Sequence, residues 1–267
     1  MSLLNFQKTL VQIGAFAFKN WIITRRNFFS LAEIIFWPLV GLFSVGLLTV
    51  FLRLDESMTG FILIGVMSMS LIQVCQIDVA YALLYDLWAK SMKHTFIAPI
   101  HPFQLISGAW LIGMARSGLV FLLLSIFSGV AFGFNFFESG AISLILYLLG
   151  LFLIAVSIGI GVCTLVLLFG YKAEVAAWSI TSIMALICGI YYPISILPSP
   201  FPEIARAIPL TYFLEYFRSF YGFEGRINNL LLRGFGLIGL YLTIEAVLLR
   251  WVIHHARKKG TFIKLSE

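Results

Sequence analysis

Six long and almost uncharged apolar runs constrain this chain more than any other feature of its sequence. They occupy residues 31–52, 58–80, 104–128, 139–168, 175–192 and 229–251. A helix needs about 20 residues to cross the hydrocarbon core of a bilayer, and most of the runs reach that length. The fourth run is longer than a crossing needs, so we expect it to tilt or protrude, and the fifth is slightly short. The runs are continuous rather than alternating, which favours helices over a membrane β-barrel.

The composition agrees with a membrane protein. Of 267 residues, 61% are hydrophobic and 11% are charged, whereas a soluble domain has about 25% charged residues. These values exclude a water-soluble enzyme as the default interpretation. We attribute the net charge of +6 to cytoplasmic loops that face anionic headgroups, and we expect no nucleic-acid binding. The three cysteines lie inside apolar runs and fit no metal-binding spacing, so we expect neither a disulfide nor a metal site.

Residues 1–25 are expected to form an amphipathic helix that lies in the membrane interface. Apolar residues recur there at helical spacing, at Leu3, Phe6, Leu10, Ile13 and Ala17, with Asn5, Lys8, Gln12 and Lys19 opposite. Such a helix places its apolar face in the bilayer and its lysines toward the headgroups. The alternative interpretation is a soluble amphipathic arm. No apolar core follows a basic start, which argues against a signal peptide.

The distribution of Lys and Arg predicts the orientation of the chain. With the N-terminus in the cytoplasm, twelve of these residues fall on the inner side and five on the outer side, with Arg116 inside a span. Basic residues favour the cytoplasmic side of short loops. We therefore expect a multi-pass protein of the cytoplasmic membrane with both termini in the cytoplasm.

Residues 81–103 are expected to form a cytoplasmic loop with a short helix from about residue 87 to residue 97. Trp88, Met92 and Phe96 are four residues apart, so we predict that they share one face of this helix. Such a face suits a partner protein, because aromatic residues dominate the binding energy of interfaces. An equal alternative is that the face packs under the chain's own helices.

The outer segment 193–228 holds five of the eight prolines, at positions 193, 198, 200, 202 and 209. Prolines prevent one continuous spanning helix, yet the segment is too apolar to extend into water. A broken re-entrant hairpin that dips part-way into the outer leaflet satisfies both observations. Glu203 and Arg206 are three residues apart, as are Glu215 and Arg218, so we expect each pair to neutralise locally, with direct substrate contact as the alternative.

Three motifs around this segment resemble the signature of type-2 ATP-binding-cassette (ABC) transporter permeases. They are Gly189-Ile190-Tyr191-Tyr192-Pro193-Ile194-Ser195-Ile196-Leu197-Pro198, Ile204-Ala205-Arg206-Ala207-Ile208-Pro209-Leu210-Thr211-Tyr212 and Glu215-Tyr216-Phe217-Arg218. Ala98-Pro99-Ile100 is similar to the element that ends the family's coupling helix. Two departures are Ile208, where the family usually has Asn, and a missing Gly-Thr before Ala98.

The resemblance implies a single all-α integral membrane domain over residues 1–267. It has an N-terminal interface helix, six transmembrane helices, a coupling helix between the second and third, and a re-entrant helical hairpin between the fifth and sixth. The resemblance assigns coupling to the ATPase to Asp86, Trp88, Lys90, Met92, His94, Phe96 and Pro99. It assigns the hairpin and gate to Tyr192, Pro193, Pro198, Pro209, Tyr212, Glu215 and Arg218.

The resemblance also implies partners. They are an ABC ATPase subunit, a second copy of the chain or a paralogous permease, and the lipid bilayer. The chain has no Gly-x-x-x-x-Gly-Lys-Ser/Thr phosphate loop, so we expect it not to be an enzyme and to bind no cofactor itself. ATP and Mg²⁺ are then expected on the partner subunit.

Arg116 is the most central charged residue and a candidate, with Phe36 and Phe43, for the translocation path. A charge inside a span costs at least about 2.5–3.5 kcal/mol, so Arg116 needs a partner. We expect it to pair with Asp78 or Glu245, and contact with an anionic substrate or a dimer partner is the alternative. For the two phenylalanines the alternative is packing against lipid.

Together these features predict the permease subunit of an exporter for an amphipathic or lipid-linked substrate, such as a drug, a lipid or a glycan. An ion-coupled secondary transporter is the alternative, but the sequence shows no half-to-half repeat. An intramembrane enzyme fits less well, because no span contains a His and no carboxylates pair at helical spacing.

Overall fold

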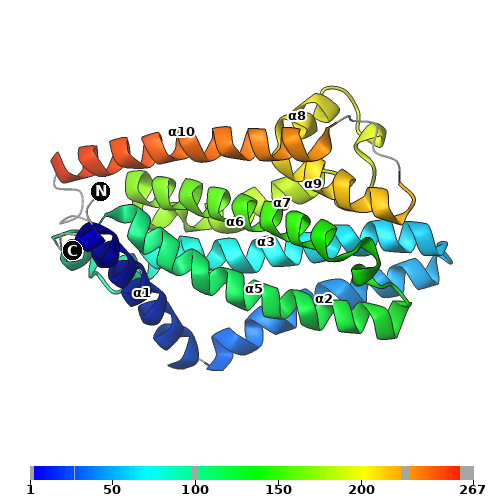
Figure 1. Cartoon of the computed structure of the whole chain (residues 1–267), viewed down its shortest axis with the longest axis horizontal. Coiled ribbons are helices and arrows are strands. Elements are labelled where there is room, and N and C mark those ends of the chain that lie inside the picture. Colours follow the sequence, from blue (N-terminus) through cyan, green and yellow to red (C-terminus); the bar gives the residue numbers. More distant parts are fainter. Residues whose placement is uncertain (1–2, 27, 98–100, 224–228, 259–267) are drawn as a thin grey trace.

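The computed structural model describes residues 3–26, 28–97, 101–223 and 229–258, and within them it contains helices and no strand. The α-helices are α1 (Leu3–Arg26), α2 (Phe28–Phe51), α3 (Glu56–Trp88), α4 (Met92–Ile97), α5 (Pro102–Phe132), α6 (Ala141–Phe169), α7 (Ala176–Ile187), α8 (Phe201–Ala207), α9 (Pro209–Arg218) and α10 (Leu230–Lys258). Short 3₁₀ helices connect them at η1 (Phe136–Ser139), η2 (Gly170–Val175), η3 (Ile194–Ile196) and η4 (Ser219–Tyr221). The longest helices follow the long axis of the molecule (Figure 1).

Five stretches of the described chain are long and apolar enough to cross a membrane. They are Ala32–Phe51, Glu56–Trp88, Pro102–Phe132, Ala141–Ile187 and Leu230–Lys258. The predicted all-helical architecture is therefore confirmed for the described residues, and five stretches of them have the length and composition of membrane spans. The stretch Ala141–Ile187 covers most of two of the six predicted runs, because α6, η2 and α7 follow one another without a gap in helical structure, although η2 carries Lys172 and Glu174. Six separate crossings stay a prediction.

The fifth predicted run, 175–192, is helical over a shorter length than expected. α7 has 12 residues, which span about 18 Å and fall short of the roughly 30 Å hydrocarbon core. The helix ends before Gly189, whose φ of 75° is the left-handed conformation that glycine adopts freely. Pro193 lies beyond that turn.

α3 is longer than predicted. It begins at the N-cap Asp55, whose side chain accepts a hydrogen bond from the Met58 backbone N–H at 3.0 Å, and it continues to Trp88 rather than ending near residue 80. Lys90 then takes a φ of 53°, which breaks the helix. The short helix α4 therefore starts at Met92 and does not include Trp88.

The predicted shared face of Trp88 and Met92 is consequently wrong. Trp88 belongs to the end of α3 and is 44% exposed, whereas Met92 opens α4 and is fully buried. The physical reason is the turn between them, which rotates the second helix relative to the first. The side chain of Phe96 and the whole of Pro99 lie outside the described residues.

α3 is the central helix of the bundle, packed between α5 and α6. Two glycines allow this close packing. A Cβ on Gly113 of α5 would lie 2.9 Å from the Cys75 carbonyl oxygen of α3, and one on Gly159 of α6 would lie 2.5 Å from the Val79 side chain. The three cysteines are free thiols buried in this core.

α1 is inclined to the bundle and packs across the first part of α5 (Figure 1). At the crossing, a Cβ on Gly108 would lie 2.6 Å from the Phe16 Cβ and 2.7 Å from the Ile13 carbonyl oxygen, so the two backbones nearly touch. Val11 and Phe18 on α1 remain 71% and 62% exposed. A helix with a packed side and an exposed apolar side agrees with a location at the membrane interface.

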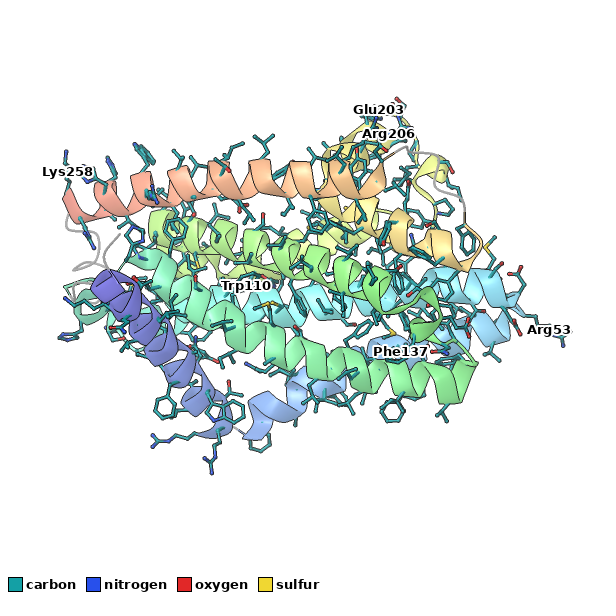
Figure 2. The ribbon with its side chains drawn as sticks, in the orientation of Figure 1. Arg53, Trp110, Phe137, Glu203, Arg206 and Lys258 are labelled. Atoms are coloured by element: carbon teal, nitrogen blue, oxygen red, sulfur yellow. The ribbon has the colours of Figure 1, made fainter. Side chains whose placement is uncertain are left out.

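Charged side chains mark the two ends of the bundle. Arg53, in the turn between α2 and α3, lies at one end, and Lys258, at the end of α10, lies at the other (Figure 2). Glu203 and Arg206 of α8 project from the half of the molecule that contains Arg53. The assignment of these residues to opposite sides of the membrane stays a prediction.

Candidate functional site

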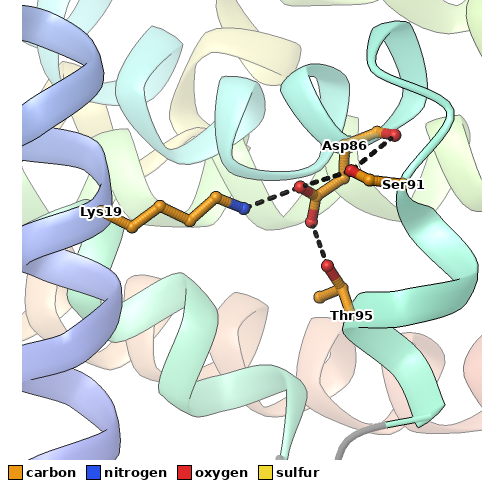
Figure 3. A network of polar contacts seen from close by, with 4 residues as sticks. All are labelled: Lys19, Asp86, Ser91 and Thr95. Carbon is orange, nitrogen blue, oxygen red and sulfur yellow. Dashed lines mark hydrogen bonds and ion pairs between the residues drawn. The ribbon is translucent and has the colours of Figure 1, made fainter.

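The end of the bundle where α1, α3 and α4 meet holds a charged network centred on Asp86. The Asp86 carboxylate accepts hydrogen bonds from Lys19 Nζ at 2.7 Å, from Thr95 Oγ1 at 2.8 Å and from Ser91 Oγ at 3.2 Å. Figure 3 shows Lys19 reaching across from α1 while Ser91 and Thr95 approach from α4 and the turn before it. Asp86 is 4% exposed, so these donors take the place of the water that an exposed carboxylate would bind. One buried carboxylate thereby links three helices.

The other expected coupling residues lie around this network. Trp88 packs edge-to-face against Tyr81 and Tyr85, with ring centroids 5.3 and 5.5 Å away, and keeps much of its surface free. Lys90 and His94 are exposed. The same end of the bundle therefore presents an aromatic and basic surface next to α4.

A second charged group lies deeper, where α1, α3 and α5 come together. Arg116 of α5 forms an ion pair with Asp78 of α3 and donates a hydrogen bond to Thr24 Oγ1 of α1 at 3.2 Å. Of the two partners expected for Arg116, the structure thus selects Asp78. Asp78 Oδ2 and Arg116 Nε are buried and have no hydrogen-bond partner within the described residues.

A cavity of about 220 Å³ adjoins this ion pair, between α2, α3, α5 and α7. Its described lining residues are Glu33, Ile34, Trp37, Pro38, Gly41, Val66, Met69, Ser70, Gln73, Ile77, Asp78, Tyr81, Tyr85, Arg116, Trp178 and Tyr191. Of the expected path residues, Arg116 lines the cavity, but Phe36 and Phe43 are not among these residues. Phe36 is 56% exposed and packs on Trp37, while Phe43 packs against Phe127 of α5. An amphipathic cavity with one ion pair can accept a partly polar ligand.

At the opposite end of the bundle, Arg218 joins α9 to α3 and α7. Its guanidinium donates to the carbonyl oxygens of Phe61 (2.9 and 3.2 Å), Gly189 (2.7 Å) and Ile190 (2.8 Å), and it lies 3.4 Å from the centre of the Phe61 ring. Arg218 is 3% exposed. A Cβ on Gly65 would lie 2.0 Å from the Ile190 oxygen, so glycine is needed for this approach.

The expected local ion pairs of the hairpin are not among those found in the described residues, where Lys19–Asp86 and Arg116–Asp78 are the pairs within 4.0 Å. Arg218 instead donates to backbone carbonyls, because a buried guanidinium offers five donors and the Gly189 and Ile190 carbonyls lie beyond the end of α7, outside a helical ladder. Burial raises the pKa of the Glu215 carboxyl, and the positive charges of Arg218 and Arg206 act in the opposite direction.

The remaining expected hairpin residues differ in their contacts and burial. Tyr212 donates to the Arg206 carbonyl oxygen at 2.7 Å, and Tyr192 donates to the Leu186 carbonyl oxygen. Pro209 is buried at the first turn of α9, while Pro193 and Pro198 are exposed. A cavity of about 370 Å³ lies beside these contacts, and its lining includes Phe61, Pro193, Glu215 and Arg218.

Sequence reasoning missed Lys19, Ser91, Thr95 and Thr24 as functional residues. Lys19 appeared only as a headgroup-facing charge, and nothing in its spacing relates it to Asp86, which is 67 residues away. Thr24 lies 92 residues from Arg116. A search for charged residues near the ends of the run 58–80 would have pointed to Asp86, but not to its partners. No group of three or more His, Cys, Asp and Glu that could hold a metal occurs in the described part of the chain.

Comparison with known proteins identifies the family of the chain. The sequence profile of the ABC-2 type transporter family matches residues 11–221, which include α2 to α9 and the greater part of α1. A protein of Archaeoglobus fulgidus, described only as uncharacterized, is 50% identical to this chain over 55 residues, which are 21% of this chain and 86% of that protein. The profile match covers most of the chain, and the helical membrane architecture accords with it, so the chain belongs to the ABC-2 type transporter family and is a membrane permease of the ABC class.

Proposed function

We propose that this permease is half of an exporter for an amphipathic or lipid-linked substrate, powered by a separate ATPase subunit that binds ATP and Mg²⁺. The Asp86 network is the observation that supports this proposal most strongly. It connects the exposed surface around α4, where a partner can bind, with α1 and with the central helix α3. A movement of α4 would therefore be passed to the helices that line the inner cavity.

The cavity beside Arg116 is the proposed part of the translocation path. It has apolar and aromatic walls and one ion pair, which suits a substrate with a polar head and an apolar body. Its volume is below the roughly 300–1,000 Å³ of a site for a drug-sized ligand. A second permease, either a copy of this chain or a paralogue, would enlarge the cavity across α2 and α7.

α2 is the proposed contact surface for that second permease. Its apolar side chains Trp37, Leu47 and Phe51 are 59%, 59% and 81% exposed. Of the residues in its apolar stretch, 22% are buried within the chain. Trp178 of α7, at the rim of the cavity, is 40% exposed.

We propose that both termini are cytoplasmic, which puts α4 on the side of the membrane where ATP is available.

The proposal is tested with the complex of the full-length permease and its ABC ATPase, reconstituted in liposomes. Trp88→Ala is expected to weaken binding of the ATPase and to reduce hydrolysis stimulated by the permease, because Trp88 is exposed beside α4. Asp86→Asn is expected to preserve binding but to lower the stimulation. Trp251→Ala is the matched control, since Trp251 is 58% exposed on α10. Wild-type binding and stimulation in both Trp88→Ala and Asp86→Asn would show that the ATPase works through another surface.

A further inference from the structure

A second groove lies within the apolar zone of the bundle, away from the cavity beside Arg116. It has a volume of about 220 Å³ and runs between α6, α7 and α10, with the start of α9 at one end. Its walls are apolar and include Ile158, Met184 and Ile238, which are at most 9% exposed. Tyr241 at its rim is 38% exposed, so the groove reaches the surface of the chain.

One carboxylate interrupts these apolar walls. Glu245 projects from the middle of α10, and its Oε1 accepts a hydrogen bond from Ser157 Oγ of α6 at 2.8 Å. Its Oε2 is buried and has no hydrogen-bond partner within the described residues. The ion pairs found in the same residues involve Asp86 and Asp78, so no described Lys, Arg or His neutralises Glu245.

An unneutralised carboxylate in the middle of a spanning helix is costly, which makes it a candidate for a functional site. An acyl chain alone would fill the apolar walls and leave Oε2 without a donor. An anionic amphiphile would be repelled by the charge. A protonated amine can donate a charge-assisted hydrogen bond to Oε2, and such bonds are stronger than those between neutral groups.

We propose that this groove binds an amphiphile with a protonated amine head and an alkyl chain. The ammonium group donates to Glu245 Oε2, while Ser157 holds the other carboxylate oxygen in place. The alkyl chain lies against Ile158, Met184 and Ile238. This site is separate from the proposed translocation path, and it requires no ATPase partner.

Two glycines provide a control for the fit of the chain. A Cβ built on Gly161, which lines the groove, has no heavy atom within 4 Å, and the same holds for Gly118 of α5, which is not among the groove's lining residues. Gly161→Leu therefore fills the groove without a clash at Cβ, and Gly118→Leu is its matched control. Glu245→Gln removes the charge, with Glu203→Gln on the exposed side of α8 as control.

The test measures the thermal unfolding of the full-length chain in neutral detergent as octylamine or octanol is added at pH 7, with native mass spectrometry to count bound molecules. We expect octylamine to raise the Tm of the wild type and both controls, with one molecule bound, and octanol to have little effect. Glu245→Gln should weaken the apparent affinity for octylamine by about tenfold or more, because a charged hydrogen bond is lost. Gly161→Leu should abolish the shift.

Three results would overturn the proposal. One is the absence of any octylamine-dependent shift in the wild type. Another is an equal shift with octanol, which would indicate a site for alkyl chains in general. The third is wild-type affinity in both Glu245→Gln and Gly161→Leu, which would place octylamine elsewhere. None of these results depends on ATP hydrolysis, so they leave the proposed permease function unaffected.

Discussion

Replacing Arg218 tests whether a single guanidinium holds the hairpin to the bundle. Arg218 makes four hydrogen bonds to three carbonyl oxygens, one on α3 and two beyond the end of α7. Lysine keeps the positive charge but presents it as a compact ammonium. It lacks the planar set of N–H donors with which the guanidinium reaches α3 and the segment after α7 at the same time. Arg218→Lys therefore separates the contribution of the charge from that of the geometry.

The expected loss follows from the carbonyls left without a donor. The Phe61 oxygen lies within α3, whereas the Gly189 and Ile190 oxygens lie beyond the end of α7. Each unsatisfied buried carbonyl costs about 1–3 kcal/mol, so a lysine that reaches only one of these two oxygens costs about 1–3 kcal/mol. Alanine leaves both oxygens without this donor and also leaves a cavity, because Arg218 is 3% exposed. At about 2–4 °C per kcal/mol, we expect Arg218→Lys to lower the Tm by roughly 2 °C or more, and Arg218→Ala by more than Arg218→Lys.

The assay is thermal unfolding of the full-length chain in detergent, followed by intrinsic tryptophan fluorescence and by the retained monodisperse fraction. Arg206→Lys is the matched control, because Arg206 is exposed on α8 (Figure 2). We expect the control to change the Tm little. An Arg218→Lys shift no larger than that of Arg206→Lys would refute the reasoning, since the carbonyl contacts would then contribute nothing that a lysine cannot supply.

Three further predictions concern the end of the bundle that contains α4. Lys19→Met should leave the ATPase bound to the permease but reduce stimulated ATP hydrolysis, because Asp86 loses its link to α1; unchanged stimulation would contradict this. Gly108→Ala should lower the Tm more than Gly118→Ala, because a Cβ on Gly108 meets α1 at 2.6 Å, and equal shifts would show that α1 adapts without cost. Partial burial and two nearby arginines lower the pKa of His101, so the unfolded chain binds a proton at this histidine more readily than the folded chain does. The Tm of the wild type should therefore fall more between pH 7.5 and pH 5.5 than the Tm of His101→Asn. Equal falls in the two proteins would show that this histidine does not cause the pH dependence.

The membrane architecture could be predicted from the sequence because it depends on length and hydropathy. The runs at 31–52, 58–80, 104–128 and 229–251 each correspond to one long helix. Helix ends were harder to predict. The end of α3 depends on a left-handed turn at Lys90, and the end of α7 precedes the left-handed Gly189, and neither conformation follows from hydropathy.

Side-chain pairing could be predicted only where the alternatives were few. Arg116 had two candidate acids within the apolar runs, and the structure selects Asp78 and directs Glu245 to Ser157. Arg218 was expected to pair with Glu215, its neighbour along the helix. It binds carbonyls instead, because the path of the chain beyond α7 brings them together, which local spacing does not reveal.

The central claim is that the ATPase subunit engages the end of the bundle where α4 lies. The most direct measurement is site-specific photo-crosslinking in the complex, with a benzophenone amino acid in place of His94 on α4 or of Phe137 in η1. Both side chains are exposed, and they lie at opposite ends of α5. We predict a crosslink to the ATPase from position 94 and none from position 137. A crosslink from position 137 alone would contradict it.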